Sequence, residues 1–285
     1  MNPSRRNRNA ATCLVAMIGV GMFNGAARAQ HLIDLAIGQS QGRIATGVFQ
    51  VQGENVAPLL SQRVFIAEFG TFPNFTSTPG FDSLVGAFQG GSQIGFDIRR
   101  ALRKWDGVSF PEGTGGIPPE RLQIKLGPAA NTRVTPTTDE LVTGFSLAVS
   151  NSGNSVGEFH HHPGFTLLEP AADGLYLLEL QLWSTQAGLG TSAPYWMVFS
   201  QNASEEDLHA AASWVRANIW HPVCPADLNN DGMVDDADFV PFVVAYNYLL
   251  CDPPGCPTDF NGDWMTDDAD FSIFAVAYDA LLCPE

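Results

Sequence analysis

Between Gln30 and about Ser200, apolar residues alternate with polar ones in short runs, and the runs are separated by Gly, Pro, Ser and Thr. In residues 121–126, for example, Leu122, Ile124 and Leu126 alternate with polar neighbours. A period of two is that of a strand with one buried face. Strands are expected over residues 32–37, 43–51, 63–69, 93–98, 121–126, 144–150, 175–183 and 195–199. Because no long helical pattern separates these strands, we predict an antiparallel β-sandwich or jelly roll over residues 30–223 rather than an α/β fold.

A helix pattern follows at Ser204. The Ser204 hydroxyl can cap the helix, and the three acids after it suit the positive end of the helix dipole. One apolar stripe then runs along the helix, formed by Leu208, Ala211, Ala212, Val215 and Ile219. We expect this helix to pack on the sandwich. Only a few residues separate it from Cys224, so the segment that follows should be held close to the β domain.

The last part of the chain is a duplication. Residues 224–251 and 256–283 align without a gap at a period of 32, with 18 of 28 positions identical. Each copy has an acidic stretch followed by one helix pattern, which includes Phe242 and Tyr246 in the first copy and Phe274 and Tyr278 in the second. Residues 224–285 are therefore predicted to form a separate small α-helical domain.

The formal net charge of −16 is concentrated in that tail. Residues 224–285 contain 13 acids and no base, whereas residues 1–29 contain four arginines and no acid. So few clustered Lys and Arg argue against a partner made of nucleic acid.

The first 29 residues have the three parts of a secretory signal peptide. A basic start is followed by an apolar stretch over residues 10–23 and by the small-residue pattern Ala27-Arg28-Ala29. Removing them takes the formal net charge to −20. No other run approaches 18 apolar residues, so we expect a secreted chain with no membrane span.

Four cysteines remain after the signal, namely Cys224, Cys251, Cys256 and Cys283. An even number in an exported protein favours disulfides. A zinc site is the alternative, but the paired C-x-x-C spacing of zinc knuckles is missing. Spacing alone leaves all three pairings open.

Each repeat opens with a 12-residue acidic loop that fits Ca²⁺, which takes six to eight oxygen ligands. Side chains at loop positions 1, 3, 5 and 12, a backbone carbonyl at position 7 and a water held by position 9 would supply them. The predicted ligands are Asp227, Asn229, Asp231, Met233, Asp235 and Asp238 in the first loop, and Asp259, Asn261, Asp263, Met265, Asp267 and Asp270 in the second. A solvated acidic surface explains the charge but neither the fixed spacing nor the duplication.

The two loops differ at position 6, where the chain turns sharply. Gly232 occupies it in the first loop and Trp264 in the second. A left-handed conformation costs a residue with a Cβ roughly 1–2 kcal/mol. Thr266 also replaces the apolar Val234 at position 8. We therefore predict weaker calcium binding at the second loop.

With these loops, with Asp at position 12 and with no helix before either loop, residues 224–285 resemble a type I dockerin. The resemblance implies a paired loop-helix module that binds a cohesin-like or other extracellular protein and is often attached to proteins acting on polysaccharides. If the helices lie antiparallel as in dockerins, the pairs Cys224–Cys283 and Cys251–Cys256 are favoured. Trp264 departs from the pattern, as do Asp236-Ala237 and Asp268-Ala269, where many dockerins carry hydroxyl residues.

The β domain has one cluster that suggests a metal. In a strand, His160 and His162 would share a face, and with His31 or Asp34 they could hold a transition metal. A run of histidines at a strand edge is the alternative interpretation, and it is favoured because no further ligand pattern is evident.

Other catalytic signals are weak. Gly144 to Ala148 lacks the last glycine of a serine-hydrolase elbow. A glycosidase would need two facing carboxylates, for which Glu68, Asp97, Glu158 and Glu179 are candidates only as acids near strands. We therefore expect a secreted, non-catalytic protein with a calcium-dependent attachment module. The alternative is an extracellular polysaccharide-active hydrolase whose β domain is catalytic.

Overall fold

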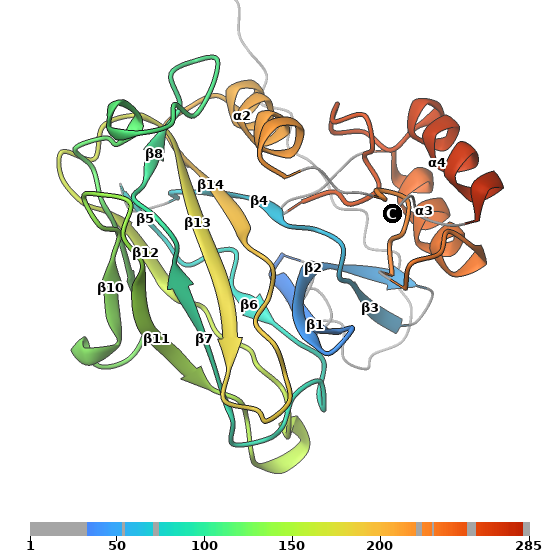
Figure 1. Ribbon diagram of the computed structural model, residues 1–285, viewed down its shortest axis with the longest axis horizontal. Helices are drawn as coiled ribbons and strands as arrows, with labels where there is room; N and C mark the ends of the chain where they lie inside the picture. The colour runs from blue at the N-terminus through green and yellow to red at the C-terminus, as the bar shows by residue number, and fades with distance from the viewer. Residues whose placement is uncertain are drawn as a thin grey trace, which may run out of the picture.

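The computed structural model describes residues 33–52, 55–70, 74–220, 224–229, 231–249 and 255–281. The predicted signal peptide, His31, Cys251 and Cys283 lie outside these residues. Within them the chain is mainly β and ends in a helical segment, which confirms the predicted class of secondary structure (Figure 1).

Each of the eight predicted strands overlaps an observed one. The strands are β1 (Leu35–Ser40), β2 (Arg43–Gln52), β3 (Asn55–Leu59), β4 (Val64–Glu68), β5 (Phe75–Thr76), β6 (Phe81–Asp82), β7 (Gln93–Ile98), β8 (Arg103–Lys104), β9 (Leu122–Lys125), β10 (Thr132–Val134), β11 (Val142–Ala148), β12 (Gly164–Leu167), β13 (Gly174–Ser184) and β14 (Tyr195–Gln201). Three short 3₁₀ turns lie between them, namely η1 (Thr114–Gly116), η2 (Ala129–Asn131) and η3 (Gly153–Ser155). The helices α2 (Glu205–Asn218), α3 (Asp236–Tyr248) and α4 (Asp268–Ala280) follow β14.

The largest sheet separates two apolar cores. Its strand order is β11-β7-β13-β14-β4, and β8 pairs with β13. Along β14, Tyr195 and Met197 face an inner core, while Trp196 and Val198 face an outer core. Successive side chains of a strand point to opposite faces, so one fully apolar strand serves both cores.

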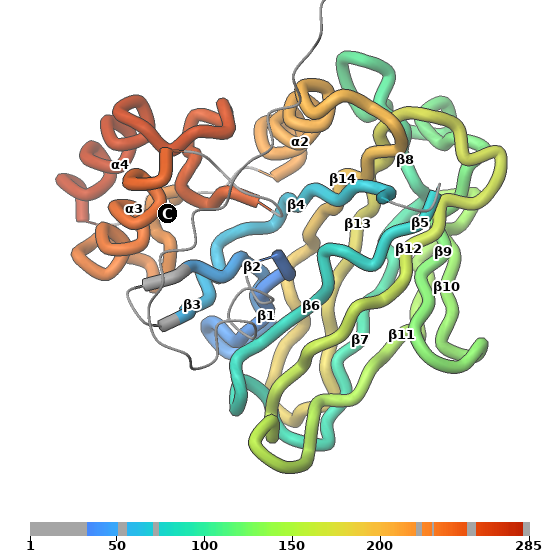
Figure 2. The backbone as a smooth tube through the Cα atoms, turned by 180° about the vertical axis from the view of Figure 1, so that it is seen from behind, coloured from blue at the N-terminus to red at the C-terminus, as the bar shows by residue number. Residues whose placement is uncertain are grey.

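Two smaller sheets close the inner core. Their strand orders are β3-β2-β1-β6 and β10-β9-β12-β5. They contribute Leu35 and Ile37 from β1, Leu122 and Ile124 from β9, and Phe165 and Leu167 from β12, all fully buried. The three sheets thus pack around a single interior (Figure 2).

The sheets are mixed rather than purely antiparallel, which corrects the prediction. β14 pairs parallel with β4, and β1 pairs parallel with β6. The remaining strand pairs are antiparallel. An alternating sequence indicates which face of a strand is buried but carries no information on the direction of its neighbour.

Helix α2 covers the outer core. As predicted, the Ser204 side chain caps it, accepting a hydrogen bond of 3.1 Å from the backbone N–H of Asp207. Its stripe of Leu208, Ala211, Ala212 and Val215 is buried against β4 and β14. The outer core therefore lies between one helix and the sheet (Figure 2).

Helices α3 and α4 lie side by side, next to β2 and β3 (Figure 1). Aromatic rings from this segment pack together in its core. The ring of Phe242 stacks on Phe274, with centroids 4.9 Å apart, and on Phe260 at 5.7 Å. The Gln50 side chain on β2 donates a 2.9 Å hydrogen bond to the carbonyl of Pro241 on α3. The helical segment is thus in direct contact with the β domain, as the short connection predicts.

Among the described residues, no helix combines the length and the apolar character needed to cross a membrane.

Candidate metal centres

The first acidic loop is shaped by hydrogen bonds from its own backbone to its carboxylates. Asp227 accepts from the N–H groups of Asp231 and Gly232, at 3.1 and 2.9 Å. Asp231 in turn accepts from the N–H of Met233 at 2.9 Å. These bonds wind the backbone around the side chains at positions 1 and 5, and the left-handed turn falls on Gly232, at φ 92°.

The carboxylate at position 12 joins each loop to its helix. Asp238 is fully buried and accepts from the N–H groups of Leu228 and Asn229 through Oδ1 and from that of Asp235 through Oδ2. Asp235 and Asp238 also form a reciprocal capping box at the start of α3. One carboxylate therefore closes the loop and begins the helix.

The second loop repeats these bonds 32 residues later. Asp270 accepts from Phe260, Asn261 and Asp267, and it forms the equivalent capping box with Asp267 at the start of α4. One carboxylate oxygen from each of Asp259, Asp263 and Asp270 lies within 4.8 Å of the other two. Three carboxylates this close repel one another unless a cation lies among them. The donor set, all hard oxygen, fits Ca²⁺.

Burial affects the acidity of these ligands. It is the main reason that the pKa values of Asp227, Asp238 and Asp259 are raised above that of a free carboxyl group. Hydrogen bonds from backbone N–H groups act in the opposite direction and favour the charged form. A divalent cation would favour the charged form further.

The two repeats support each other through reciprocal bonds at loop position 8. The N–H of Val234 donates to the carbonyl of Leu281, and that of Thr266 to the carbonyl of Leu249, both at 3.1 Å. Leu249 and Leu281 are the left-handed C-caps of α3 and α4. Each loop is thus tied to the end of the other repeat's helix.

Trp264 fixes the second loop to the β domain. It adopts the left-handed conformation expected at position 6, with φ 66°, and its side chain joins the outer core. Its indole stacks on the ring of His209 at 4.0 Å with 7° between the planes. Its Nε1 also lies 3.2 Å from the hydroxyl of Ser213. The residue that departs from the calcium-loop pattern is therefore an anchor between the helical segment and α2.

Arg216, also on α2, contacts the first ligand of the same loop. Its Nη1 lies 3.2 Å from Oδ2 of Asp259, and its Nη2 donates to the Asp259 carbonyl. Asp259 is fully buried. No pattern in the sequence predicts this contact, because Arg216 lies outside the repeat and no spacing relates the two residues.

Cys224 and Cys256 are both disulfide-bonded, as the even number of cysteines predicts. The other two cysteines lie outside the described residues, so the pairing Cys224–Cys283 with Cys251–Cys256 remains a prediction.

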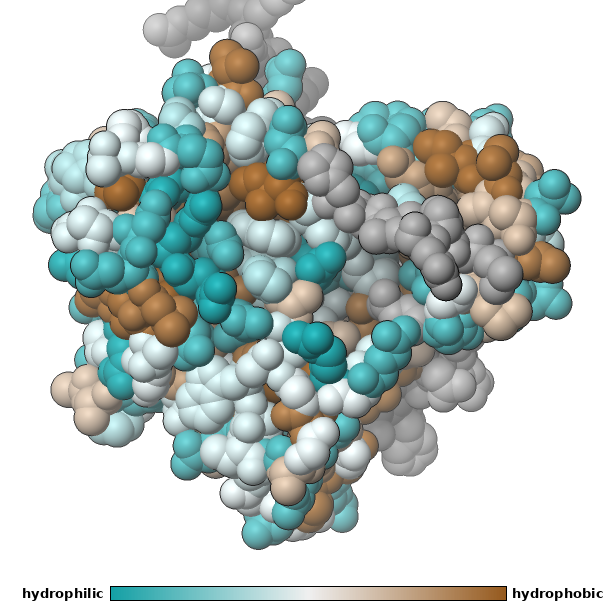
Figure 3. Space-filling view, in the orientation of Figure 1, coloured by the Kyte–Doolittle hydropathy of each residue, from teal (hydrophilic) through white to brown (hydrophobic). Residues whose placement is uncertain are grey.

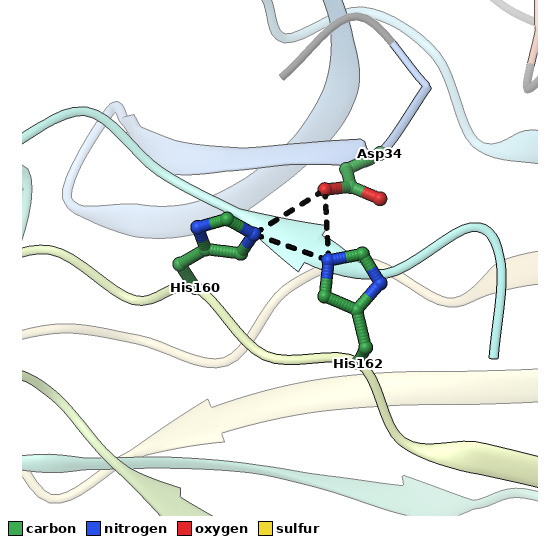
Figure 4. A group of neighbouring side chains, drawn as sticks. All are labelled: Asp34, His160 and His162. Atoms are coloured by element: carbon green, nitrogen blue, oxygen red, sulfur yellow. Dashed lines mark hydrogen bonds and ion pairs between the residues drawn. The ribbon is translucent and has the colours of Figure 1, made fainter. Parts of the chain in front are cut away.

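In the β domain the structure brings His160 and His162 together with Asp34 (Figure 4). The three residues come from two places in the chain, Asp34 directly before β1 and the histidines along a stretch paired with β6. Asp34 is therefore the third member of the cluster that the sequence left open between it and His31.

The acids considered for a glycosidase have other surroundings. Glu179 forms an ion pair with Arg100 at 3.3 Å. A carboxylate oxygen of Glu158 lies within 4.8 Å of a ring nitrogen of His160 and of a carboxylate oxygen of Asp82. Glu179 therefore faces a guanidinium rather than a second candidate acid. The carboxylate close to Glu158 belongs to Asp82, whose side chain is fully buried.

No protein-family model matches this chain, and no curated protein or solved structure matches it either.

Proposed function

We propose that this chain is a secreted, non-catalytic protein in which residues 224–285 form a calcium-ordered, dockerin-like module that attaches it to an extracellular partner protein. The observation that carries the proposal is the convergence of Asp259, Asp263 and Asp270 in a loop whose hydrogen bonds recur 32 residues earlier. Calcium in these loops would neutralise the carboxylates and hold the starts of α3 and α4 in place.

Exposed apolar side chains on the two helices support a docking role. Val240 and Tyr248 on α3 and Ile273 and Val276 on α4 are between 40% and 74% exposed. Figure 3 shows apolar residues gathered over α4, at the end of the molecule away from the sheets. The tail has 13 acids and no base, so the complementary partner is a protein with a basic surface around an apolar patch.

Capture of a partner protein on the immobilised mature chain, residues 30–285, tests this function. We expect a protein from the culture medium of the source cells to be retained in calcium and released by a chelator. Val276→Asp should abolish retention by placing a charge in the patch. Val108→Asp is the matched control, because Val108 is equally exposed, at 76% against 74%, but lies in the β domain.

Retention that survives both the chelator and Val276→Asp would contradict calcium-dependent docking through the helices. A separate assay addresses the alternative of a polysaccharide-active hydrolase. Release of reducing sugar from extracellular polysaccharides by the purified chain would contradict the non-catalytic assignment.

A further inference from the structure

The side chains of Asp34, His160 and His162 converge on one point in the β domain (Figure 4). The two Nε2 atoms lie 3.1 Å apart. Oδ2 of Asp34 lies 3.3 Å from Nε2 of His162 and 3.6 Å from Nε2 of His160. Three ligand atoms of the types that transition metals prefer therefore form a nearly equilateral triangle.

The size of this triangle fits a tetrahedral ion. With zinc–ligand bonds of about 2.0–2.1 Å and tetrahedral angles, ligand atoms are about 3.3–3.4 Å apart. The observed separations lie on both sides of that value. In an octahedral site with similar bonds, adjacent ligands would be about 3.0 Å apart, and two of the three separations are clearly longer.

The local backbone explains why the two histidines share a face. His161 pairs with Phe81 of β6 through two backbone hydrogen bonds of 2.8 and 2.9 Å, so residues 160–162 are extended. Alternation then sends the His161 ring to the other side, where its Nε2 bonds the carbonyl of Ala148 at 2.9 Å. A Cβ on Gly80 would lie 2.6 Å from Nδ1 of His162, so glycine is needed to seat that ring.

Hydrogen bonding sets the tautomer of His162. Its Nδ1 lies 3.1 Å from the carbonyl of Ser77, which can only accept a proton. Nδ1 therefore carries the hydrogen of the neutral ring, and the lone pair of Nε2 faces the cluster. Metal-binding histidines are oriented in this way by an outer carbonyl.

The surroundings of the Asp34 carboxylate also indicate a bound cation. Its side chain is fully buried, and Oδ1 accepts a 2.8 Å hydrogen bond from the N–H of Gly80. Oδ2, which faces the histidines, is buried and accepts no hydrogen bond, and it can form an ion pair with His160 or His162 only if that ring is protonated. A buried carboxylate oxygen without a donor is costly, and a bound cation would satisfy it.

We propose that Asp34, His160 and His162 bind one zinc-type divalent transition-metal ion, independently of the acidic loops. The site is open on one side, since the side chains of His160 and His162 are 26% and 31% exposed. A fourth position is therefore left for water or a small oxygen or nitrogen ligand, as in sites with three protein ligands. Asp82 and Glu158, close to His160, add negative charge that attracts the cation.

Metal titration of the mature chain tests the proposal. The protein is stripped with chelator, returned to saturating Ca²⁺ so that the acidic loops are filled, and titrated with Zn²⁺ by calorimetry. We expect one equivalent to bind. Co²⁺ in its place should give the intense visible absorption of a tetrahedral site.

Zn²⁺ titration of variants tests whether the three residues bind the ion. His160→Gln with His162→Gln should weaken Zn²⁺ binding at least a hundredfold, and Asp34→Asn at least tenfold. His161→Gln is the matched control in the same segment and should bind like the wild type. Gly80→Ala keeps all three ligands but displaces the His162 ring, and it should also weaken binding.

Two outcomes would overturn the proposal. One is the absence of a Zn²⁺ equivalent in a calcium-saturated wild type whose circular dichroism spectrum is that of a folded protein. The other is Zn²⁺ affinity unchanged in the double histidine variant. Because the histidines are partly exposed, that variant should keep the unfolding midpoint of the metal-free wild type, which separates loss of the site from loss of the fold.

Discussion

Arg216 of α2 and Asp259 of the second loop form an ion pair, with Nη1 of the guanidinium 3.2 Å from Oδ2 of the carboxylate. The residue predicted to be the first calcium ligand of that loop therefore already has a positive partner from the β domain. The pair connects the state of the loop to the contact between the two parts of the chain.

Replacing Arg216 should have opposite effects on stability and on metal affinity. Breaking a buried ion pair from one side costs about 3–5 kcal/mol, so Arg216→Met should lower the free energy of unfolding in chelator by about that amount. The same change removes a charge that repels calcium, a repulsion worth several kcal/mol at an effective dielectric of about 20. The calcium affinity of the second loop should therefore rise about tenfold or more.

Urea unfolding with and without calcium, together with calorimetric titration, measures both effects. Arg100→Met is the control, because Arg100 pairs with Glu112 on the β domain, at 3.0 Å. A calcium affinity that falls in Arg216→Met would mean that the guanidinium positions Asp259 for the ion rather than competing with it.

Trp264 has a strained backbone and a buried side chain. We expect the buried side chain to have the larger effect on the free energy of unfolding. Trp264→Gly relieves a left-handed conformation worth about 1–2 kcal/mol. It also removes a largely buried indole, which costs about 3–5 kcal/mol. We expect a net loss of about 1–4 kcal/mol in the free energy of unfolding, measured in urea.

Gly232, the equivalent position of the first loop, allows the backbone contribution to the free energy of unfolding to be measured separately. A Cβ added to Gly232 would meet open space, so Gly232→Ala reports the left-handed conformation alone. A gain in stability on Trp264→Gly would show that the anchor on α2 contributes less than the strain.

The contact of His209 with Trp264 should make the anchor sensitive to pH. Burial lowers the pKa of His209 from its ordinary value of 6.5, whereas Glu205, Glu68 and Asp259 act in the opposite direction. Just below pH 6.5 the unfolded chain therefore binds more protons than the folded one. The contribution of this contact to the free energy of unfolding is therefore fully present above pH 6.5. It declines as the pH falls toward the lowered pKa of His209 in the folded chain.

The difference between wild type and His209→Phe isolates this titration, because the acids common to both proteins cancel. Urea midpoints measured in calcium between pH 7 and pH 5 should fall less steeply for the variant. Parallel profiles for the two proteins would contradict the assignment to His209.

Local patterns in the sequence were enough to predict the long strands and the three α-helices within the described part of the chain. The alternation in β9 and β13 and the Ser204 cap are signals carried by neighbouring residues. The short strands β5, β6 and β8 have two residues each, too few for any periodicity. The parallel pairing of β4 with β14 depends on where the chain returns after a long excursion, which no local pattern records.

In the candidate sites, too, the sequence predicts groupings of nearby residues but not contacts between distant ones. Loop spacing was enough to predict a set of acidic ligands, because the residues of each set lie within 12 positions of one another. The sequence suggested His160 and His162 by strand alternation, but it could not choose between His31 and Asp34. Arg216, like Asp34, comes from a distant part of the chain, and only the fold brings it to its partner.

Calcium titration of the chelator-treated mature chain measures directly whether the two acidic loops bind the ion. We predict two calcium ions per chain, with the weaker at the second loop, and one ion in each of Asp238→Ala and Asp270→Ala. A stoichiometry that neither substitution changes, or the absence of any calcium binding by the folded chain, would contradict the account.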